Sequence, residues 1–334
     1  MEKIQFKHLD IPIIRSCNLA CVGCITHSNH KNIKGTVRLE ESREWLKFWA
    51  SKLKPETVTL FGGEPLLHPE LAEWAEAMRE IWGPWQILAC NTNGYYIDKL
   101  YDLIPRLFNG AGLSHPANAE LVGLHLIVSV QTGIEPYLSK VKENIETLKD
   151  KIVEWHLTQP GVTDAYWHLW LDEYDINYKR WYRLMVNGMQ TPVRISTCDQ
   201  YKLSWCSHYK GTGENMEPMY DYNDSWYEEN HSHCQARDFV TLHRGTMWKC
   251  PPIGVLENTL TTFDIDKRPD WAPYLQEYKT VSPTSTDEEI IAWFDQRNNP
   301  EKVCNMCGFA GPKSVYITAD DRNHELKNYW KYTL

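Results

Sequence analysis

The sequence predicts an α/β protein whose strands form a parallel sheet, open or closed into a partial barrel. In the first half of the chain, short apolar runs alternate with amphipathic helical patterns. Such alternation is typical of strand–helix–strand units, which build parallel sheets. With 334 residues, 42% of them hydrophobic, the chain is long enough for one barrel-sized domain and a smaller module. We expect functional residues where strands end and loops begin.

The elements are expected in the following order. Apolar runs predict strands at residues 11–14, 58–61, 87–89, 124–130, 166–171 and 193–195. Apolar residues at helical spacing predict helices at residues 39–53, 71–82 and 138–152. The composition changes after about Thr197, where polar residues without a clear period begin. We therefore expect a core domain at residues 1–197 and a smaller C-terminal module with a tail at residues 198–334.

Charge and hydropathy exclude two classes of partner. The formal net charge is -9, which argues against duplex nucleic acid as the main partner, because a nucleic-acid binder carries a basic surface. No apolar run approaches the length of about 20 residues that crosses a bilayer. The first ten residues also lack the apolar segment of a signal peptide. We expect a cytoplasmic protein without a membrane partner.

Three of the ten cysteines form a tight group near the N-terminus. In a reducing compartment, cysteines are more often ligands or buried thiols than disulfides. Cys17, Cys21 and Cys24 have the spacing CxxxCxxC and directly follow the first predicted strand. Three thiolates on one short loop can hold three irons of a cubane cluster and leave the fourth iron open. A zinc site completed by His27 or His30 is the alternative.

This cysteine spacing, together with Gly62-Gly63-Glu64-Pro65 after the second strand, resembles the radical S-adenosylmethionine (SAM) superfamily. The resemblance covers roughly residues 11–196 and implies a partial (β/α)6 barrel of the TIM-like kind. It implies that the open iron of a 4Fe–4S cluster on Cys17, Cys21 and Cys24 chelates the methionine moiety of SAM. It also implies that an electron, supplied by a flavodoxin- or ferredoxin-type donor, cleaves SAM to a 5′-deoxyadenosyl radical that abstracts hydrogen from the substrate.

The resemblance also implies which residues bind SAM. Glycines at 62 and 63 allow backbone to approach a ligand closely, and the Glu64 carboxylate is expected to accept hydrogen bonds from the cofactor's ammonium group. Asn93 and Ser129 follow the third and fourth strands, where the family's polar groups meet the ribose and the methionine carboxylate; a turn or capping role is the alternative for each. One residue departs from the pattern, because Gly23 stands where the family usually has an aromatic residue against the adenine.

A second set of cysteines lies in the C-terminal half. Cys234 is followed after ten residues by Gly245 and after four more by Cys250, and Cys304 and Cys307 form a CxxC pair. This form resembles the auxiliary-cluster module called SPASM, or its shorter version called twitch. The resemblance implies a small C-terminal iron–sulfur module with one fully ligated auxiliary 4Fe–4S cluster. A structural zinc site on the same four thiols is the alternative.

The remaining three cysteines, Cys90, Cys198 and Cys206, are interpreted as buried thiols. Relatives with auxiliary modules dehydrogenate, epimerise or cross-link their substrates. Because the first cysteine loop starts at Cys17, no leader-binding domain fits before it, and we expect a small-molecule substrate such as a sugar, an aminocyclitol or a nucleotide derivative. A peptide-modifying enzyme that needs a separate leader-binding partner is the first alternative, and a zinc-stapled binding module without activity is the second. The motifs assign no catalytic side chain.

Overall fold

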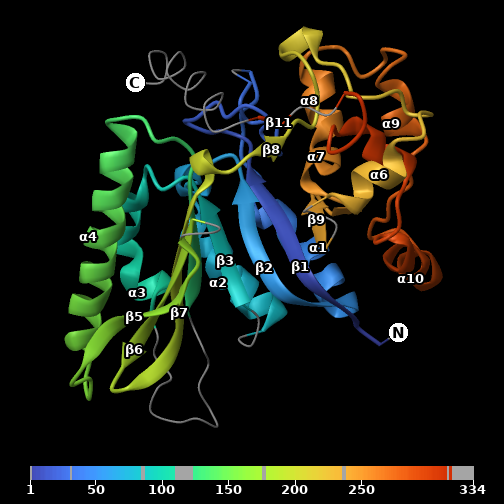
Figure 1. The fold of residues 1–334 in the computed structure, drawn as a ribbon. Coiled ribbons are helices and arrows are strands. Elements are labelled where there is room, and N and C mark those ends of the chain that lie inside the picture. Colours follow the sequence, from blue (N-terminus) through green and yellow to red (C-terminus); the bar gives the residue numbers. More distant parts are fainter. Residues whose placement is uncertain are drawn as a thin grey trace.

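A nine-stranded sheet forms the centre of the molecule, in the order β10-β9-β1-β2-β3-β4-β7-β6-β5 (Figure 1). The computed structural model describes residues 2–30, 32–83, 87–109, 123–174, 178–234, 238–313 and 316–317. The strands of this sheet are β1 (Ile4–Ile14), β2 (Leu53–Gly62), β3 (Ile87–Thr92), β4 (Leu124–Val130), β5 (Ala165–Asp172), β6 (Lys179–Val186), β7 (Met189–Asp199), β9 (Phe239–His243) and β10 (Thr246–Trp248). Two short strands, β8 (Trp205–Cys206) and β11 (Tyr316–Ile317), pair with each other outside it.

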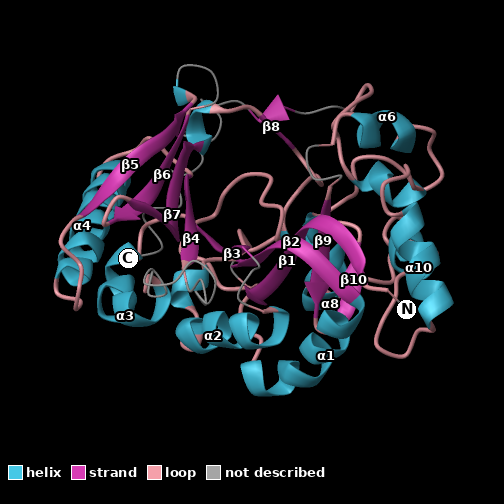
Figure 2. Cartoon of the chain, turned by 90° about the horizontal axis from the view of Figure 1, so that it is seen from below, coloured by secondary structure: helices cyan, strands magenta, loops and turns pink. Residues whose placement is uncertain are grey.

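The sheet curves, and helices cover its convex side. Figure 2 shows the arc of strands with helices along its outer side. These helices are α1 (Leu39–Lys52), α2 (Leu71–Trp82), α3 (Ile104–Leu107) and α4 (Tyr137–Leu157). Strands β1 to β4 and β7 pair in parallel, so their carboxyl ends share one edge of the sheet. The predicted α/β fold with a partial barrel is confirmed.

The regular strand–helix repeat ends after α4, which differs from a strict sixfold repeat. Strands β5, β6 and β7 follow one another as an antiparallel meander, and only β7 returns in parallel beside β4. Residues 187–188 join β6 to β7 as a tight turn, in which Asn187 and Gly188 both have positive φ values. A turn of that kind twists two adjacent strands into a hairpin. The meander therefore takes the place of one strand–helix crossover.

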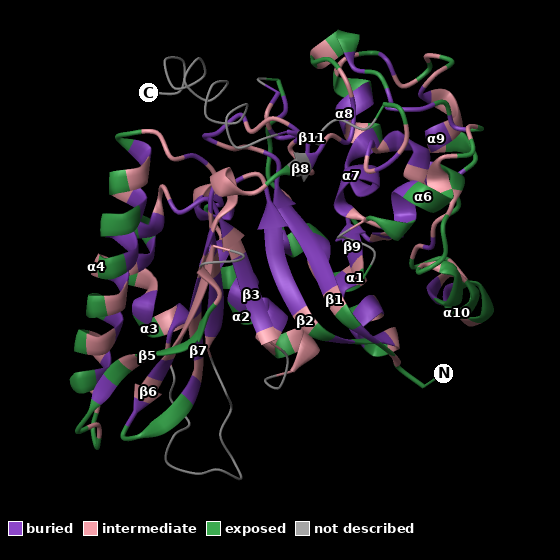
Figure 3. Ribbon diagram, viewed as in Figure 1, coloured by how far each residue is buried: buried purple, intermediate pink, exposed green. Residues whose placement is uncertain are grey.

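The helices pack by apolar faces that the sequence pattern predicts. Trp49 of α1 and Trp74 of α2 are fully buried against the sheet. The longest helix, α4, buries an apolar stripe that includes Val141, Leu148 and Ile152, while its other face is exposed (Figure 3). Within the described ranges, no helix combines the length and apolarity needed to cross a membrane.

The C-terminal part of the chain adds to the main sheet and also builds a second core. Strand β9 pairs in parallel with β1, and Trp49 Nε1 donates a hydrogen bond of 2.7 Å to the carbonyl oxygen of Gly245 in the β9–β10 turn. A separate apolar cluster around Trp271 and Tyr274 joins α7 (Pro251–Gly254), α8 (Leu256–Thr262) and α9 (Ala272–Gln276). The other helices of this part are α6 (Tyr227–Ser232) and α10 (Asp287–Gln296), and α10 buries Ile290 and Phe294 in the main core. The domain boundary after residue 197 stays a prediction, since β9 and β10 extend the sheet of the first part.

Candidate active site

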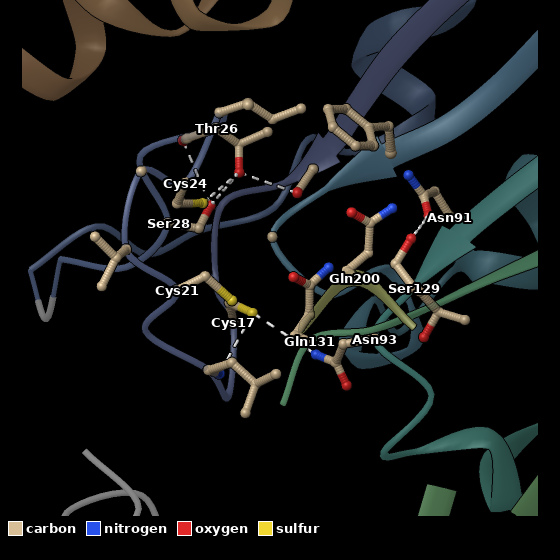
Figure 4. A pocket seen from close by; sticks show the side chains of 18 residues that line it. Cys17, Cys21, Cys24, Thr26, Ser28, Asn91, Asn93, Ser129, Gln131 and Gln200 are labelled. Atoms are coloured by element: carbon tan, nitrogen blue, oxygen red, sulfur yellow. Dashed lines mark hydrogen bonds between the residues drawn. The ribbon is translucent and has the colours of Figure 1, made fainter. Parts of the chain in front are cut away.

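A pocket of about 170 Å³ lies at the carboxyl ends of β1 to β4. All three N-terminal cysteines line it, on the loop that follows β1 (Figure 4). In Figure 4 the cysteines lie on one side of the pocket and polar side chains from the strand ends lie on the other. The side chains labelled there are Cys17, Cys21, Cys24, Thr26, Ser28, Asn91, Asn93, Ser129, Gln131 and Gln200. The loop and the strand ends thus bring thiols and polar groups together around one space.

Close backbone contact between two strand ends holds the cysteine loop in place. The amide of Gly63 donates to the carbonyl oxygen of Ile14 at 2.8 Å, and the amide of Glu64 donates to that of Ser16 at 2.9 Å. A Cβ atom at Gly62 would lie 2.1 Å from the Ile14 oxygen, and one at Gly63 would lie 2.2 Å from the Ser16 oxygen. Both glycines line the pocket. Their small size therefore admits protein backbone as well as leaving room on the pocket side.

Within the loop, backbone conformation and side-chain contacts fix the third cysteine. Gly23 has a φ of +63°, a left-handed conformation that favours glycine. This explains why no aromatic residue occupies that position. Cys24 Sγ lies 3.4 Å from Thr26 Oγ1, which donates to the carbonyl oxygen of Gly62 at 3.1 Å. The loop is thereby tied again to the end of β2.

Glu64 supports the pocket from behind and is not among its lining residues. Its carboxylate accepts hydrogen bonds from the amides of Leu66 (2.9 Å) and Asn93 (2.8 Å) and from Thr92 Oγ1 (2.7 Å). Burial raises the pKa of Glu64 to about 7, against the lowering effect of these donors. Three protein donors therefore already bind this carboxylate, and the contact with the cofactor's ammonium group that the sequence led us to expect stays a prediction.

Asn93 and Ser129 both line the pocket. The side-chain nitrogen of Asn93 lies 2.8 Å from Asn18 Oδ1 and 3.8 Å from Cys17 Sγ, so this residue joins the end of β3 to the cysteine loop. Ser129 donates to Asn91 Oδ1 at 3.1 Å across the ends of β4 and β3. Their placement agrees with a ligand-facing position, while the roles predicted for them stay predictions.

The chemistry of the three thiols fits an iron–sulfur cluster. Burial raises the pKa of Cys17 well above its usual range, and the neighbouring Cys21 and Glu64 raise it further. Bare thiolates are therefore costly here, and a bound cation is what makes them stable. Among the described residues, no three His, Cys, Asp or Glu side chains are arranged to hold a single metal ion. A cubane cluster takes each thiolate on a different iron, so its ligands surround a volume and do not converge on one ion.

A buried arginine links this loop to the C-terminal region. Arg15, which is 3% exposed, donates to Asn258 Oδ1 (2.9 Å), Thr259 Oγ1 (2.8 Å) and the carbonyl oxygen of Val255 (3.4 Å). Burial lowers the pKa of Arg15 to about 10, and the charge of Cys24 opposes this effect. The guanidinium thus brings positive charge toward the thiols and anchors the loop to residues 255–259.

The sequence analysis did not select several pocket residues, among them Gln131, Gln200, Thr26 and Ser28. Gln131 directly follows the end of β4, so the rule that selected Ser129 at the same strand end would have found it. Gln200 follows β7, but its contribution depends on the meander, which the sequence pattern does not indicate. Thr26 and Ser28 lie just after Cys24, and nothing in their spacing marks them.

The four C-terminal cysteines also gather around one space. Cys234, Cys250, Cys304 and Cys307 all line a pocket of about 40 Å³. Cys234 follows α6, Cys250 directly precedes α7, and the CxxC pair lies in the turn at residues 302–307. Three separate segments thus meet at one pocket, and a metal or cluster on these four cysteines remains a prediction.

Burial and mutual repulsion raise the pKa of three of these thiols, those of Cys250, Cys304 and Cys307. Burial raises the pKa of Cys304 to about 11, and burial followed by the charges of Cys206 and Cys250 raises that of Cys307 well above its usual range. Lys249 lines the same pocket, is 6% exposed and forms a 2.7 Å ion pair with Glu301. Burial raises the pKa of Cys250 and Cys304, and the positive charge of Lys249 offsets part of this rise. Deprotonation of these thiols therefore requires a bound metal group that takes up their negative charge.

Two further side chains border the second pocket. Cys206 is buried in β8, which raises the pKa of its thiol, and the charge of Cys234 raises it further. His208 Nδ1 lies 3.2 Å from Cys307 Sγ. Burial lowers the pKa of His208 to about 4, so its ring is neutral near pH 7.

A larger cavity of about 600 Å³ lies on the concave side of the sheet and reaches both pockets. It shares Phe61, Asn91 and Ser129 with the first pocket, and Cys250 and Cys307 with the second. Its polar lining includes His8, Asp10, Thr59, His125, Lys179, Ser196 and Cys198. Buried polar groups along this wall suit a ligand with hydrogen-bonding groups.

Two hydrogen-bonded groups organise this polar lining. His8 Nε2 lies 2.9 Å from Asp10 Oδ1 and 2.9 Å from Thr59 Oγ1. On the opposite wall, His125 Nε2 lies 3.0 Å from Ser196 Oγ. Ionised carboxylates only accept hydrogen bonds, so Nε2 of His8 carries a proton when Asp10 is ionised.

Comparison with known proteins supports the interpretation of the cysteine loop. Residues 11–168 match the family model described as Radical SAM superfamily. A GTP 3′,8-cyclase from Aquifex aeolicus (strain VF5) is 36% identical over 96 residues, which are 28% of this chain and 29% of that protein. The aligned part is therefore under a third of that relative's length.

Several solved structures are similar over longer stretches at low identity. The crystal structure of BtrN in complex with AdoMet and 2-DOIA has 12% identity, covers 92% of this chain and 94% of that one, and has a TM-score of 0.45. The structure of Streptococcus suis SuiB bound to S-adenosylmethionine has 10% identity, coverages of 88% and 67%, and a TM-score of 0.34. That of anSMEcpe with bound AdoMet has 19% identity, coverages of 44% and 41%, and a TM-score of 0.30.

The close contact at Gly63 predicts that an added methyl group displaces the cysteine loop. In Gly63→Ala, the new Cβ would lie 2.2 Å from the Ser16 oxygen, so Ser16 and the adjoining Cys17 must move. We expect a loss of about 1–3 kcal/mol in the free energy of unfolding and a loss of iron from the first site. Iron and sulfide per chain after anaerobic reconstitution would measure this. Gly161→Ala is the control, because nothing lies within 4 Å of its Cβ and only its φ of +79° opposes the change. Full iron content in Gly63→Ala would contradict the prediction.

The three hydrogen-bond donors to Glu64 predict that Glu64→Gln lowers the stability of the fold. An amide nitrogen in place of one carboxylate oxygen faces a backbone or hydroxyl donor, which leaves a buried donor without an acceptor. We expect the free energy of unfolding to fall by about 1–3 kcal/mol in urea titrations near pH 8, above the pKa of Glu64. Glu73→Gln, at a half-exposed ion pair with Arg106, should change it by under about 1 kcal/mol. Equal stability of the two variants would count against the supporting role of Glu64.

Proposed function

We propose that this chain, whose residues 11–168 form a domain of the radical SAM superfamily, removes a hydrogen atom from a small polar substrate held between two cysteine sites. The observation that carries this proposal is the 600 Å³ cavity, which shares lining residues with both cysteine pockets. Its volume lies within the range of about 300–1,000 Å³ that is usual for small-molecule sites. A sugar, aminocyclitol or nucleotide derivative fits such a cavity.

In this proposal, Cys17, Cys21 and Cys24 hold a 4Fe–4S cluster, and the strand ends bind SAM beside it. When bound, the cluster and SAM supply a 5′-deoxyadenosyl radical, which takes a hydrogen atom from the substrate. Asn93 and Ser129 face the pocket and offer hydrogen-bonding groups for SAM. Gly62 and Gly63 leave room beside the cysteines, and Glu64 fixes the backbone of Asn93 from behind.

The second cysteine site is proposed to hold an auxiliary 4Fe–4S cluster of the twitch or SPASM kind. Cys234, Cys250, Cys304 and Cys307 are its ligands. Three of these, Cys234, Cys250 and Cys307, also line the central cavity, so an electron acceptor at this site would lie beside the substrate. Such proximity favours dehydrogenation, in which a substrate radical gives up an electron and a proton. An epimerisation has no need of an electron acceptor.

His8 offers a place for the proton that a dehydrogenation releases. Its ring lines the cavity, and with Nε2 hydrogen-bonded to Asp10 the other ring nitrogen, Nδ1, is an acceptor. The enclosed walls of β1, β2 and β7 keep bulk water from the substrate. The electron donor for the first cluster is proposed to be of the flavodoxin or ferredoxin type, and the cytoplasmic location expected from the sequence remains a prediction.

Formation of 5′-deoxyadenosine tests the first part of the proposal. With dithionite as reductant, the wild-type protein should cleave SAM, and the triple variant Cys17→Ala, Cys21→Ala, Cys24→Ala should not. Cys90→Ala is the matched control, since that thiol is fully buried in β3 away from the cysteine pockets. Retained 5′-deoxyadenosine formation in the triple variant would overturn the assignment.

Metal analysis tests the second cysteine site. After anaerobic reconstitution, the wild-type protein should hold about eight irons, and the first-site triple variant about four, because each cubane cluster contains four. Zinc is measured in the same samples. About four irons and one equivalent of zinc in the wild type would replace the auxiliary cluster with a structural zinc site. Absence of iron together with zinc binding would favour the zinc-stapled module without activity.

A further inference from the structure

The wall formed by β6 and β7 carries two arginines outside the cysteine sites. Arg183 of β6 lies directly opposite Arg194 of β7 in the antiparallel ladder. Two residues further along each strand, Trp181 lies opposite Ser196, and both of these line the central cavity. Because residues two apart on a strand share a face, both arginines lie on the concave side, next to the cavity.

Neither arginine has a carboxylate partner among the residues that the structure describes. Like charges directly opposite each other in a ladder destabilise it. The Nε atoms of both arginines are buried without a hydrogen-bond partner, and Arg183 donates to the side-chain oxygen of Gln190, which is neutral. The two adjacent guanidinium groups therefore have N–H groups that can donate hydrogen bonds to an anion.

The electrostatic effect of the pair is felt by its neighbours. Arg194 lies opposite His125 of β4, and burial together with the charges of Arg194 and Arg183 lowers the pKa of His125 to about 4. Burial and the charge of Arg183 also lower the pKa of Arg194. The one carboxylate that lines the cavity, Asp10, is hydrogen-bonded to His8. The wall is therefore locally positive in a chain whose net charge is -9.

An exposed tryptophan completes the group. The Arg183 guanidinium lies 4.4 Å from the centre of the Trp170 ring, and that of Arg194 lies 5.9 Å from it. Trp170 is 49% exposed, and its ring is 5.9 Å from that of Trp181 in the cavity lining. Stacking on an indole holds a guanidinium in one plane while its N–H groups stay available.

We propose that Arg183 and Arg194 bind a phosphoryl group of the substrate, so that the substrate class is a phosphorylated small molecule. Two forked guanidiniums match the several oxygens and double charge of a phosphate better than the single charge of a carboxylate. This inference rests on the proposed function, since it treats the central cavity as the substrate site.

The position of the pair also limits the size of the substrate. Ser129 lines the cysteine pocket, and His125, the partner of Arg194, lies four residues before it on β4. At about 3.3 Å per residue, the arginines lie roughly 13 Å along the strand from the first cysteine site. A substrate must therefore extend over several bonds between its phosphoryl group and the carbon that loses hydrogen.

Calorimetric titration of the reconstituted holoenzyme with inorganic pyrophosphate tests this site without any turnover. We expect Arg183→Gln and Arg194→Gln each to weaken pyrophosphate binding at least about tenfold, the usual scale for a lost charge-assisted contact. Arg183→Lys should retain part of the affinity, because it keeps the charge and loses the fork. Arg180→Gln is the matched control: Arg180 lies on the other face of β6 and pairs with Asp172 at 3.5 Å. Iron content and melting temperature, measured for each variant, identify any that fails to fold.

Three results would overturn the inference. The wild-type protein fails to bind pyrophosphate at millimolar concentration; or Arg180→Gln weakens binding as much as the other two changes; or succinate binds at the arginine pair as tightly as pyrophosphate, which would make the ligand a carboxylate. Cleavage of SAM by Arg183→Gln and Arg194→Gln is measured separately with dithionite. Variants that lose pyrophosphate binding but still form 5′-deoxyadenosine would show that the arginine site is separate from the radical chemistry. If the proposed radical function is wrong, the wild-type protein will also fail to form 5′-deoxyadenosine.

Discussion

The contact on which the rest of the site depends is the backbone approach between the ends of β1 and β2. Two hydrogen bonds join the amides of Gly63 and Glu64 to the carbonyl oxygens of Ile14 and Ser16. Gly62 and Gly63 permit this approach because a Cβ atom at either position would collide with the same carbonyl oxygens. The cysteine loop starts at the very next residue after Ser16, so its origin is set by the sheet. Glu64, held in the same turn, then fixes Asn93 at the end of the neighbouring strand. These contacts thus fix the position of the cysteine loop relative to the ends of the strands.

Burial of charge is the second constraint that shapes the molecule. Burial and neighbouring charges raise the pKa of Cys17 at the first pocket and of Cys250, Cys304 and Cys307 at the second. A buried cation lies near each pocket, Arg15 at the first and Lys249 at the second. These cations offset part of the negative charge that deprotonated ligands bring. The pair formed by Arg183 and Arg194 has the opposite character, since it is positive charge without an anion among the described residues. The same interior therefore contains two groups of cysteines and one pair of arginines without a carboxylate partner among the described residues.

Much of this arrangement could be predicted from sequence, and the remainder depends on contacts between distant segments. Local spacing was sufficient for the N-terminal cysteines, because one loop places its own residues together, whereas the second set comes from three separate segments. Strand–helix alternation was sufficient for the parallel half of the sheet, but the meander at β5 to β7 depends on a hairpin turn whose effect on pairing is not local. The hydrogen bonds that Glu64 accepts from Thr92 and Asn93, at a strand end almost thirty residues away, could not be predicted from local spacing. The opposition of Arg183 and Arg194 follows from strand register, which apolar periodicity alone does not specify.

Arg15 has a consequence for how the protein holds together over time. Its guanidinium emerges beside the first cysteine loop but finds its acceptors at residues 255–259, and β9 pairs with the same strand from which Arg15 emerges. Cys250, a cysteine of the second site, lies five residues before Val255, the first residue of that acceptor segment. Arg15 therefore connects the two cysteine sites through one short, buried stretch of chain. Loosening of the packing at one site would thus weaken the contacts that hold the other, and we expect the two sites to open together in local unfolding.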